Sequence, residues 1–249
     1  MTIRRLTKRQ RRVLRQDGVG DLFNEVSKGK FNLIDVERRW PLTETQRNVI
    51  AAYNEGQHLV LHGVAGTGKT FLSMYLALNE VLTTEDVDKV YIIRSVVPTR
   101  DMGFLPGNAR QKAAVYEAPY SAIATELFGR GDAYDILKNK NNVEFLSTSF
   151  IRGTTFRNCI IIADEINNMT FHELDSLITR VGNNCRIIFC GDYRQTDLIT
   201  TADRNGLQRF MNVLNTIKSF THIEFGISDI VRSGIVKEYI ISKSDLGYV

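Results

Sequence analysis

The sequence predicts an α/β fold in which a parallel sheet carries helices on both faces, and three observations lead to it. Short runs of almost continuously apolar residues, such as HLVLHG (58–63) and CIIIADE (159–165), are typical of strands buried on both faces. These runs alternate with segments of helical character, which is the order that a parallel sheet requires. Polar residues follow several of the runs directly, at the strand ends where ligands bind in such folds.

The amino-terminal part of the predicted domain begins with an extended segment or short strand and continues with a capped helix. Thr43 is a suitable N-cap for this helix, Gln46 is placed to cap back, and Gly56 is expected to end it. A later helix is expected to be interrupted at Pro119. The predicted elements of this part are the extended segment 31–43, helices 43–56, 69–82 and 107–129, and strands 58–63 and 89–95.

The carboxyl-terminal part repeats the alternation of buried strands and helices. Thr170 is a candidate N-cap at the start of the first helix in this part. The predicted strands are 142–147, 159–165, 185–192 and 221–226, and the predicted helices are 170–181, 206–217 and 234–242.

The composition indicates a globular protein of a reducing compartment. The 249 residues are 43% hydrophobic and 24% charged, which suits a packed domain and excludes the disordered class. No apolar run approaches the roughly 20 residues that a membrane helix needs, and the basic amino terminus lacks the apolar core of a secretory signal. Cys159, Cys185 and Cys190 show no metal-ligand or redox spacing, so we expect free thiols, a cytoplasmic location and no membrane partner.

The positive charge of the chain is concentrated at its amino terminus. Residues 1–15 carry seven Lys or Arg and no acid, so the other 234 residues carry a net charge of −3 although the whole chain has +4. Such an arm is expected to contact the phosphates of a nucleic acid or an acidic partner. The alternatives are a solvated, frayed terminus or a helix docked through its apolar residues. The candidate contacts are Arg4, Arg5, Lys8, Arg9, Arg11 and Arg12.

The segment GVAGTGKT (63–70) fits the phosphate-loop pattern G-x-x-x-x-G-K-[ST], and it lies between a predicted strand and a predicted helix as that pattern requires. Lys69 is expected to reach the β- and γ-phosphates of ATP, and Thr70 to bind Mg²⁺. The alternative is a glycine-rich turn without a ligand. The backbone N–H groups expected to surround the phosphates belong to Gly63, Val64, Ala65, Gly66, Thr67, Gly68, Lys69 and Thr70.

An acid pair and a glutamine complete the predicted catalytic set. Asp164, at the end of a strand, is expected to hold Mg²⁺, and Glu165 to orient or deprotonate the attacking water. The alternative for the pair is a cap on the following helix. Gln195, in GDYRQTDL (191–198), is expected to lie near the γ-phosphate, unless it is simply exposed on a polar turn.

With these motifs the chain resembles the PhoH-like ATPase family, which is related to the superfamily-one helicases. The resemblance covers roughly residues 31–242, although Ile166-Asn167 stands where the family commonly has Ala-Gln and Ile199 replaces a common proline. The matching stretches are PLTETQ (41–46), GVAGTGKT (63–70), GFLPG (103–107), RGTTF (152–156), IIADEINN (161–168), GDYRQTDL (191–198), NGL (205–207) and DIVRSGIV (229–236).

The resemblance implies a P-loop NTPase with a RecA-like parallel sheet, organised as a basic arm (1–18) and a single ATPase domain (19–249). It also implies roles for single residues: Gln46 would read the adenine, Arg232 would contact the γ-phosphate, and Arg152 would contact nucleic acid or the next subunit. The short single-domain form is similar to phage-encoded members, for which the location would be the host cytoplasm.

A single domain supplies half of the site that related helicases build between two domains, unless Arg232 folds back onto its own nucleotide. We therefore expect a homo-oligomeric ring, for which the resemblance implies a hexamer, with Arg232 acting in trans on the ATP of a neighbour.

Three functions remain open at this stage. The first is an ATP-driven motor on RNA or single-stranded DNA, with Arg94, Arg152 and the basic arm contacting the strand. The second is an ATP-gated ring that binds a protein partner without motor activity. The third, a P-loop kinase with Arg94 and Arg100 in a lid, is less favoured because Glu165 suits water better than a phosphoryl acceptor.

Overall fold

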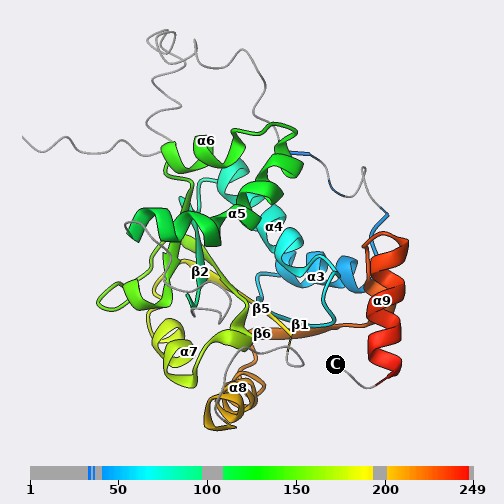
Figure 1. Ribbon diagram of the computed structural model, residues 1–249. Coiled ribbons are helices and arrows are strands. Elements are labelled where there is room, and N and C mark those ends of the chain that lie inside the picture. Colours follow the sequence, from blue (N-terminus) through cyan, green and yellow to red (C-terminus); the bar gives the residue numbers. More distant parts are fainter. Residues whose placement is uncertain (1–32, 35, 37–40, 97–108, 193–200, 247–249) are drawn as a thin grey trace, which may run out of the picture.

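The computed structural model describes residues 33–34, 36, 41–96, 109–192 and 201–246. Its centre is a six-stranded sheet in which every neighbouring pair is parallel (Figure 1). The sheet confirms the predicted α/β fold with a parallel sheet. Its strands, in the order β3-β2-β4-β5-β1-β6, are β1 (His58–Gly63), β2 (Lys89–Arg94), β3 (Val143–Ser147), β4 (Cys159–Asp164), β5 (Cys185–Gly191) and β6 (Phe220–Phe225).

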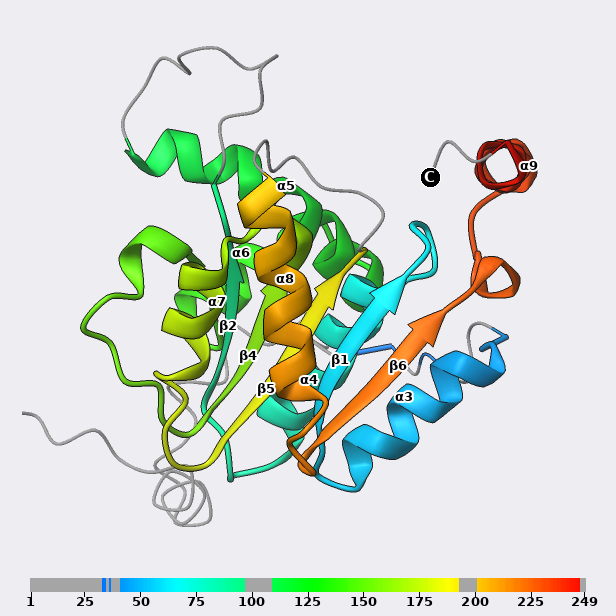
Figure 2. The ribbon, with the colours of Figure 1, turned by 90° about the horizontal axis from the view of Figure 1, so that it is seen from below.

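Helices cover both faces of the sheet, as predicted (Figure 2). One face carries α3 (Glu44–Asn54), α4 (Lys69–Thr83), α5 (Ala109–Phe128) and α6 (Ala133–Asn139), and the other carries α7 (Phe171–Ile178) and α8 (Thr201–Leu214). The last helix, α9 (Gly234–Asp245), lies beyond the edge strand β6 (Figures 1 and 2). Among the helices of the described ranges, none is both long enough and apolar enough to cross a membrane.

The strands build two cores because successive side chains point to opposite faces. In β4, Ile160 and Ile162 join the core beneath α3–α6, whereas Ile161 and Ala163 join the core beneath α7 and α8. All four side chains have no exposed surface. Burying one isoleucine in this way stabilises the fold by about 1.5–3 kcal/mol, which is why the strand tolerates so few polar residues before its end.

Several elements differ from the predicted ones. Helix α5 continues through Pro119, so the predicted interruption is wrong: the proline removes one N–H donor, but the helix on both sides of it persists. Helix α6 has only seven residues, which is too few for a periodic pattern, and it was not predicted. Helix α8 begins at Thr201, five residues before the predicted start. Within the segment 31–43, the residues that the structure describes form no strand.

Two of the three cysteines lie closer together than their spacing in the sequence suggests. Cys159 and Cys185 begin the neighbouring strands β4 and β5 and pair in register, with their sulfur atoms 3.5 Å apart. All three thiols are free. Burial raises the pKa of Cys159 well above its usual range, so this thiol stays protonated and unreactive.

The strand register fixes the location of the site. Arg94 is the register partner of Asp164 across β2 and β4, and His62 is the partner of Gly191 across β1 and β5. Because all strands run in one direction, their carboxyl ends meet at a single edge of the sheet. The phosphate-loop motif, the acid pair and the start of the third motif therefore converge, as the sequence predicts.

Candidate active site

The phosphate loop connects the end of β1 to the start of α4, and its glycines are needed for its backbone path. Gly63, Gly66 and Gly68 have φ angles of +113°, +77° and +84°, in the region that favours glycine. A Cβ atom on Gly63 would lie 2.2 Å from the carbonyl oxygen of Phe225 on the neighbouring strand. The loop therefore depends on close approach of β6 as well as on left-handed conformations.

We expect Gly63→Ala to lower the free energy of unfolding by about 2–5 kcal/mol, because it adds overpacking against Phe225 to the strain of a positive φ. Gly56→Ala is the matched control, since Gly56 also has a positive φ (+84°) but nothing within 4 Å of a new Cβ. The control should lose only about 1–2 kcal/mol. Urea denaturation measures both, and equal losses would contradict the steric argument.

The ammonium group of Lys69 is bound to the backbone of the phosphate loop. Its Nζ donates to the carbonyl oxygens of Gly63 and Val64, each at 2.8 Å. Burial lowers the pKa of Lys69, and the nearby Asp192 opposes that shift. The positive charge is thus held at the loop by neutral carbonyls, which a phosphate group can replace as partners.

Asp164 and Thr70 form a pair of oxygen donors beside the loop. The hydroxyl of Thr70 donates to Oδ1 of Asp164 at 2.9 Å, and the hydroxyl of Tyr120 donates to Oδ2 at 2.9 Å. Burial raises the pKa of Asp164, and these two hydrogen bonds oppose the shift. Mg²⁺ prefers oxygen ligands and usually takes few from the protein, so Thr70 and Asp164 fit the magnesium site that the sequence predicts.

Glu165 follows Asp164 in an unusual backbone conformation. It has φ +54° and ψ +47°, the left-handed region that a non-glycine residue adopts at a cost of about 1–3 kcal/mol. Burial raises the pKa of Glu165, the charge of Asp164 raises it further, and Arg94 opposes both. Of the two neighbouring carboxylates, Asp164 is the one that accepts hydrogen bonds from Thr70 and Tyr120.

Arg94 lies beside the acid pair, whereas the sequence predicts that it contacts nucleic acid. Burial alone would lower the pKa of Arg94, but Tyr120, Glu165 and Asp164 raise it. Its guanidinium therefore serves as the positive neighbour of the acid pair. Arg152, the other predicted contact within the described ranges, is exposed on the chain that follows the short helix η2 (Thr148–Phe150).

Gln46 joins helix α3 to the phosphate loop. Its Oε1 accepts from the backbone N–H of Thr43 at 3.1 Å, which completes the predicted capping box, and its Nε2 donates to the carbonyl of Thr67 at 3.0 Å. Only 6% of Gln46 is exposed. The contact with Thr67 was not predicted, and recognition of adenine by Gln46 stays a prediction.

Arg232 lies against the phosphate loop of its own chain. The backbone N–H of Val231 donates to the carbonyl of Gly66 at 3.1 Å, and Cγ of Arg232 lies 2.9 Å from the position of a Cβ on Gly66. This is the folded-back arrangement, in which the arginine belongs to the site of its own chain. Arg232 is thus placed beside the phosphate loop of its own chain, and its action in trans on the ATP of a neighbour stays a prediction.

Two further residues organise the site without having been predicted. Tyr120 comes from α5, and no motif marked it. Asn167, in the short helix η3 (Ile166–Asn168), accepts from the backbone N–H of Asp192 at 3.1 Å and thus ties the acid pair to the end of β5. The departure from the family pattern at this position could have drawn attention to it. Gln195 and residues 1–18, with their candidate arm contacts, lie outside the described residues.

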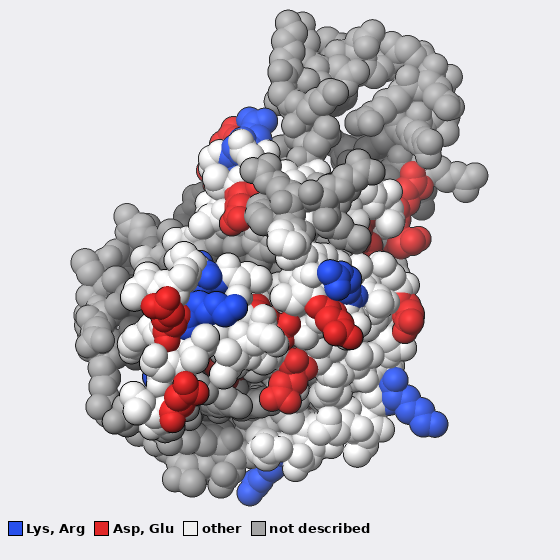
Figure 3. All heavy atoms as spheres, turned by 90° about the vertical axis from the view of Figure 1, so that its right-hand side faces the viewer, with Lys and Arg blue, Asp and Glu red and all other residues white. Residues whose placement is uncertain are grey.

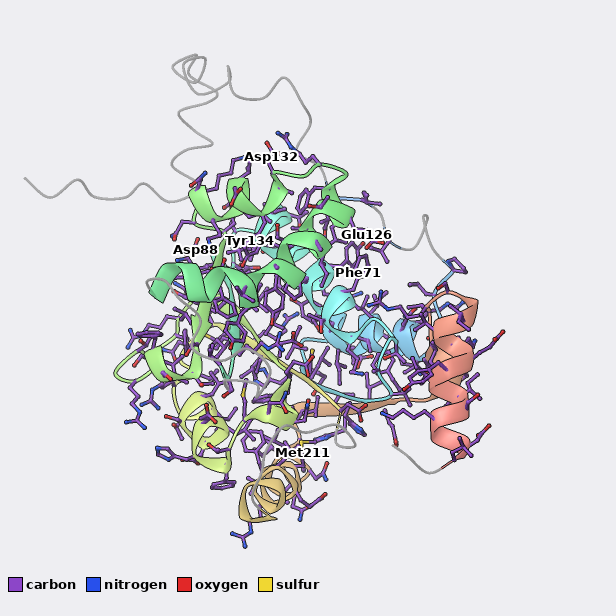
Figure 4. The ribbon with its side chains drawn as sticks, in the orientation of Figure 1. Phe71, Asp88, Glu126, Asp132, Tyr134 and Met211 are labelled. Atoms are coloured by element: carbon purple, nitrogen blue, oxygen red, sulfur yellow. The ribbon has the colours of Figure 1, made fainter. Side chains whose placement is uncertain are left out.

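A cavity of about 790 Å³, a volume that suits a nucleotide, is lined by Gln46, residues 65–70 of the phosphate loop, Asp164, Glu165 and Arg232. Phe71 of α4 and Glu126 of α5 also line it and are labelled in Figure 4. Apolar side chains from several segments contribute to the lining, which suits a purine base. The lining residues outside the motifs are Val36, Phe71, Leu72, Pro119, Ala122, Ile123, Glu126 and Cys190.

Comparison with known proteins places the chain among relatives of the expected kind. The family model described as PhoH-like protein matches residues 40–242. The protein PhoH of Escherichia coli (strain K12) is 32% identical over 197 residues, which are 77% of this chain and 54% of that protein. A PhoH-like protein of Mycobacterium leprae is 30% identical over 206 residues, which are 80% and 57% of the two chains. The chain thus spans little more than half the length of these curated relatives.

Solved structures with a similar arrangement include a terminase and a helicase. The large terminase of a thermophilic bacteriophage has a TM-score of 0.48 at 12% identity, covering 80% of this chain and 50% of the terminase. The UvsW helicase of bacteriophage T4 has a TM-score of 0.45 at 16% identity, covering 85% and 67% of the two chains.

Proposed function

Because this chain belongs to the PhoH-like protein family, we propose that it is a Mg²⁺-dependent ATP hydrolase, coupled to RNA or single-stranded DNA and assembled as a homo-oligomeric ring. The main support for hydrolase activity is that Lys69, the Thr70–Asp164 pair and Glu165 all line one nucleotide-sized cavity. The family and this site support a nucleotide-binding P-loop protein; hydrolysis, the metal, the polymer and the ring are proposals.

Different residues of the chain have different roles in the proposed hydrolysis. Thr70 and Asp164 would hold Mg²⁺, which neutralises phosphate charge when bound. Lys69 exchanges its loop carbonyls for phosphate oxygens, and the loop N–H groups surround the phosphate. Glu165 accepts the proton of the attacking water, a role that suits a carboxylate whose pKa is raised by burial. Gln195, as predicted, would sense the γ-phosphate.

Tyr120 supports the metal ligand, and Tyr120→Phe tests this support. We expect the Mg²⁺ concentration for half-maximal hydrolysis to rise about 10–100-fold, because the partner that orients Asp164 is lost. Tyr53→Phe is the control: it removes another buried hydroxyl, one that donates to Glu80. The control should keep the Mg²⁺ dependence of the native chain, and a similar rise in both variants would contradict the role of Tyr120.

The ring is supported by the surface of α9, beside the cavity. Ile235 is 74% exposed and Tyr239 is 66% exposed on this helix, and Val231 at the cavity mouth is 53% exposed. A contact between copies would cover such apolar residues. Arg232 can act in cis within the ring, so the ring does not depend on an arginine supplied by a neighbour. Sedimentation that finds only monomer with ATP and Mg²⁺ present would count against the ring.

The first experiment is ATP hydrolysis with and without single-stranded RNA and DNA, with Glu165→Gln as the blank. Stimulation of many fold by one polymer, absent in the blank, supports the coupled ATPase. Deleting residues 1–15 should then weaken nucleic-acid binding, and the binding constant should fall with salt by about 0.7 log units per log unit of salt for each phosphate contact. Hydrolysis that no polymer changes would contradict the coupling.

The second candidate is an ATP-gated ring that binds a protein partner. One observation favours it: on the face that includes α9, acidic and basic side chains of the described residues are interspersed rather than gathered by sign (Figure 3). A nucleic-acid groove is usually more strongly basic. Deletion of residues 1–15 distinguishes this ring from the nucleic-acid-coupled ATPase, because a protein-binding ring does not need the basic arm.

A further inference from the structure

The segment between β6 and α9 crosses the phosphate loop, and we name residues 226–232 the strap. Its first part is the short helix η4 (Ile227–Asp229). Oδ2 of Asp229 accepts from the backbone N–H of Gly226 at 2.9 Å and from the hydroxyl of Thr45 at 3.0 Å. Only 4% of Asp229 is exposed. One buried carboxylate oxygen thus closes the turn of the strap and joins it to the first turn of α3.

The far end of the strap rests on the glycines of the phosphate loop. Besides the Val231–Gly66 backbone hydrogen bond, Cγ2 of Val231 lies 3.8 Å from the position of a Cβ on Gly68. Arg232 crosses Gly66, and Cδ1 of Ile240 on α9 lies 3.5 Å from the same Cβ position. The strap therefore contacts the phosphate loop at Gly66 and Gly68, and α9 contacts it at Gly66.

Helix α3 contacts the strap and the loop through adjacent residues. Thr45 binds Asp229 of the strap, and Gln46 binds Thr67 of the loop. Loop, strap and helix are thus joined pairwise by hydrogen bonds. Only two residues separate Asp229 from Arg232, so a fixed Asp229 restricts where the guanidinium can reach.

We propose that Asp229 is a positioning residue: by holding the strap to Thr45 it keeps Arg232 over the phosphate loop of the same chain, where it distinguishes ATP from ADP. This inference rests on the proposed ATP hydrolysis. A carboxylate is suited to the task because a charged acceptor binds two donors more strongly than a neutral amide does. Asp229 itself does not line the nucleotide cavity, so its effect passes through Arg232.

The test compares Asp229→Asn and Thr45→Val with Asp245→Asn, whose side chain is exposed at the end of α9. Steady-state hydrolysis gives kcat and KM, and a fluorescent nucleotide displaced by ATP or ADP gives both dissociation constants with the full chain. We expect kcat to fall about tenfold in the first two variants, the size of effect that losing a hydrogen bond to a charged group produces. Their preference for ATP over ADP should fall as well, with ADP affinity unchanged.

Two further variants separate positioning from general damage. Asp229→Asn combined with Arg232→Ala should be no slower than Arg232→Ala alone, because the first change acts only through the arginine. Thr45→Ser retains the hydroxyl and should restore native kinetics. Additive losses, or equal weakening of ADP and ATP binding, would overturn the inference. A native chain that does not hydrolyse ATP would overturn the proposed function instead, and an active native chain whose Asp229 and Thr45 variants match Asp245→Asn would overturn the inference alone.

Discussion

Glu165→Gln is expected to bind ATP but to hydrolyse it about 10²–10⁴ times more slowly than the native chain, the range that loss of a general base produces. Glutamine has the shape of glutamate, but its amide cannot accept the proton of the attacking water. The change also removes a buried charge next to Asp164, so binding of the negatively charged nucleotide should not weaken. Single-turnover hydrolysis and nucleotide binding on the same sample measure the two effects separately.

Glu144→Gln is the matched control for this variant. Glu144 is half-exposed and pairs with Lys89 at 2.6 Å, and such surface pairs contribute only about 0–1 kcal/mol. The control should hydrolyse ATP at the native rate. If Glu165→Gln retained more than a tenth of the native kcat, another group would have to activate the water and our assignment of Glu165 would be wrong.

Lys69→Ala is expected to lower kcat by about 10²–10³-fold, as for loss of one preorganised group that stabilises developing charge, and to weaken ATP binding as well. The variant loses the ammonium group that Gly63 and Val64 hold at the loop, and no other described lysine lines the cavity. Steady-state kinetics over a range of ATP concentrations gives both kcat and KM.

Lys138→Ala serves as the control, because Lys138 is an exposed partner of Glu117. It should leave both kinetic constants unchanged. A Lys69→Ala variant with native kcat and raised KM would show that the lysine contributes to binding alone, and that charge in the transition state is neutralised by other groups.

The sequence allowed the sheet, the phosphate loop and the acid pair to be predicted because each depends on local pattern. The buried run that ends at Asp164 and the glycines of the loop are visible in a few consecutive residues. Tyr120 could not be predicted in the same way, since its partner Asp164 lies 44 positions away and an ordinary buried tyrosine has the same pattern. The helix around it was predicted over 107–129, but with an interruption at Pro119 that the structure does not have.

The roles of Arg94 and Arg232 depended on three-dimensional placement rather than on residue type. An arginine at a strand end suits a phosphate backbone as well as a neighbouring carboxylate, and only the register between β2 and β4 sets Arg94 beside Asp164. For Arg232, the sequence predicts action in trans, with the folded-back arrangement as the alternative. The hydrogen bond from Val231 to Gly66, between residues far apart in the chain, places Arg232 beside its own phosphate loop, which no local pattern indicates.

The left-handed backbone of Glu165 has a consequence for the evolution of this chain. Among the described residues, the other non-glycine positions with positive φ are all asparagines: Asn141, Asn158 and Asn184. Asparagine tolerates this region better than glutamate does, so selection for stability alone would not retain a glutamate at 165. Its presence marks a position where activity and stability favour different amino acids, and where searches for more stable variants would tend to select inactive ones.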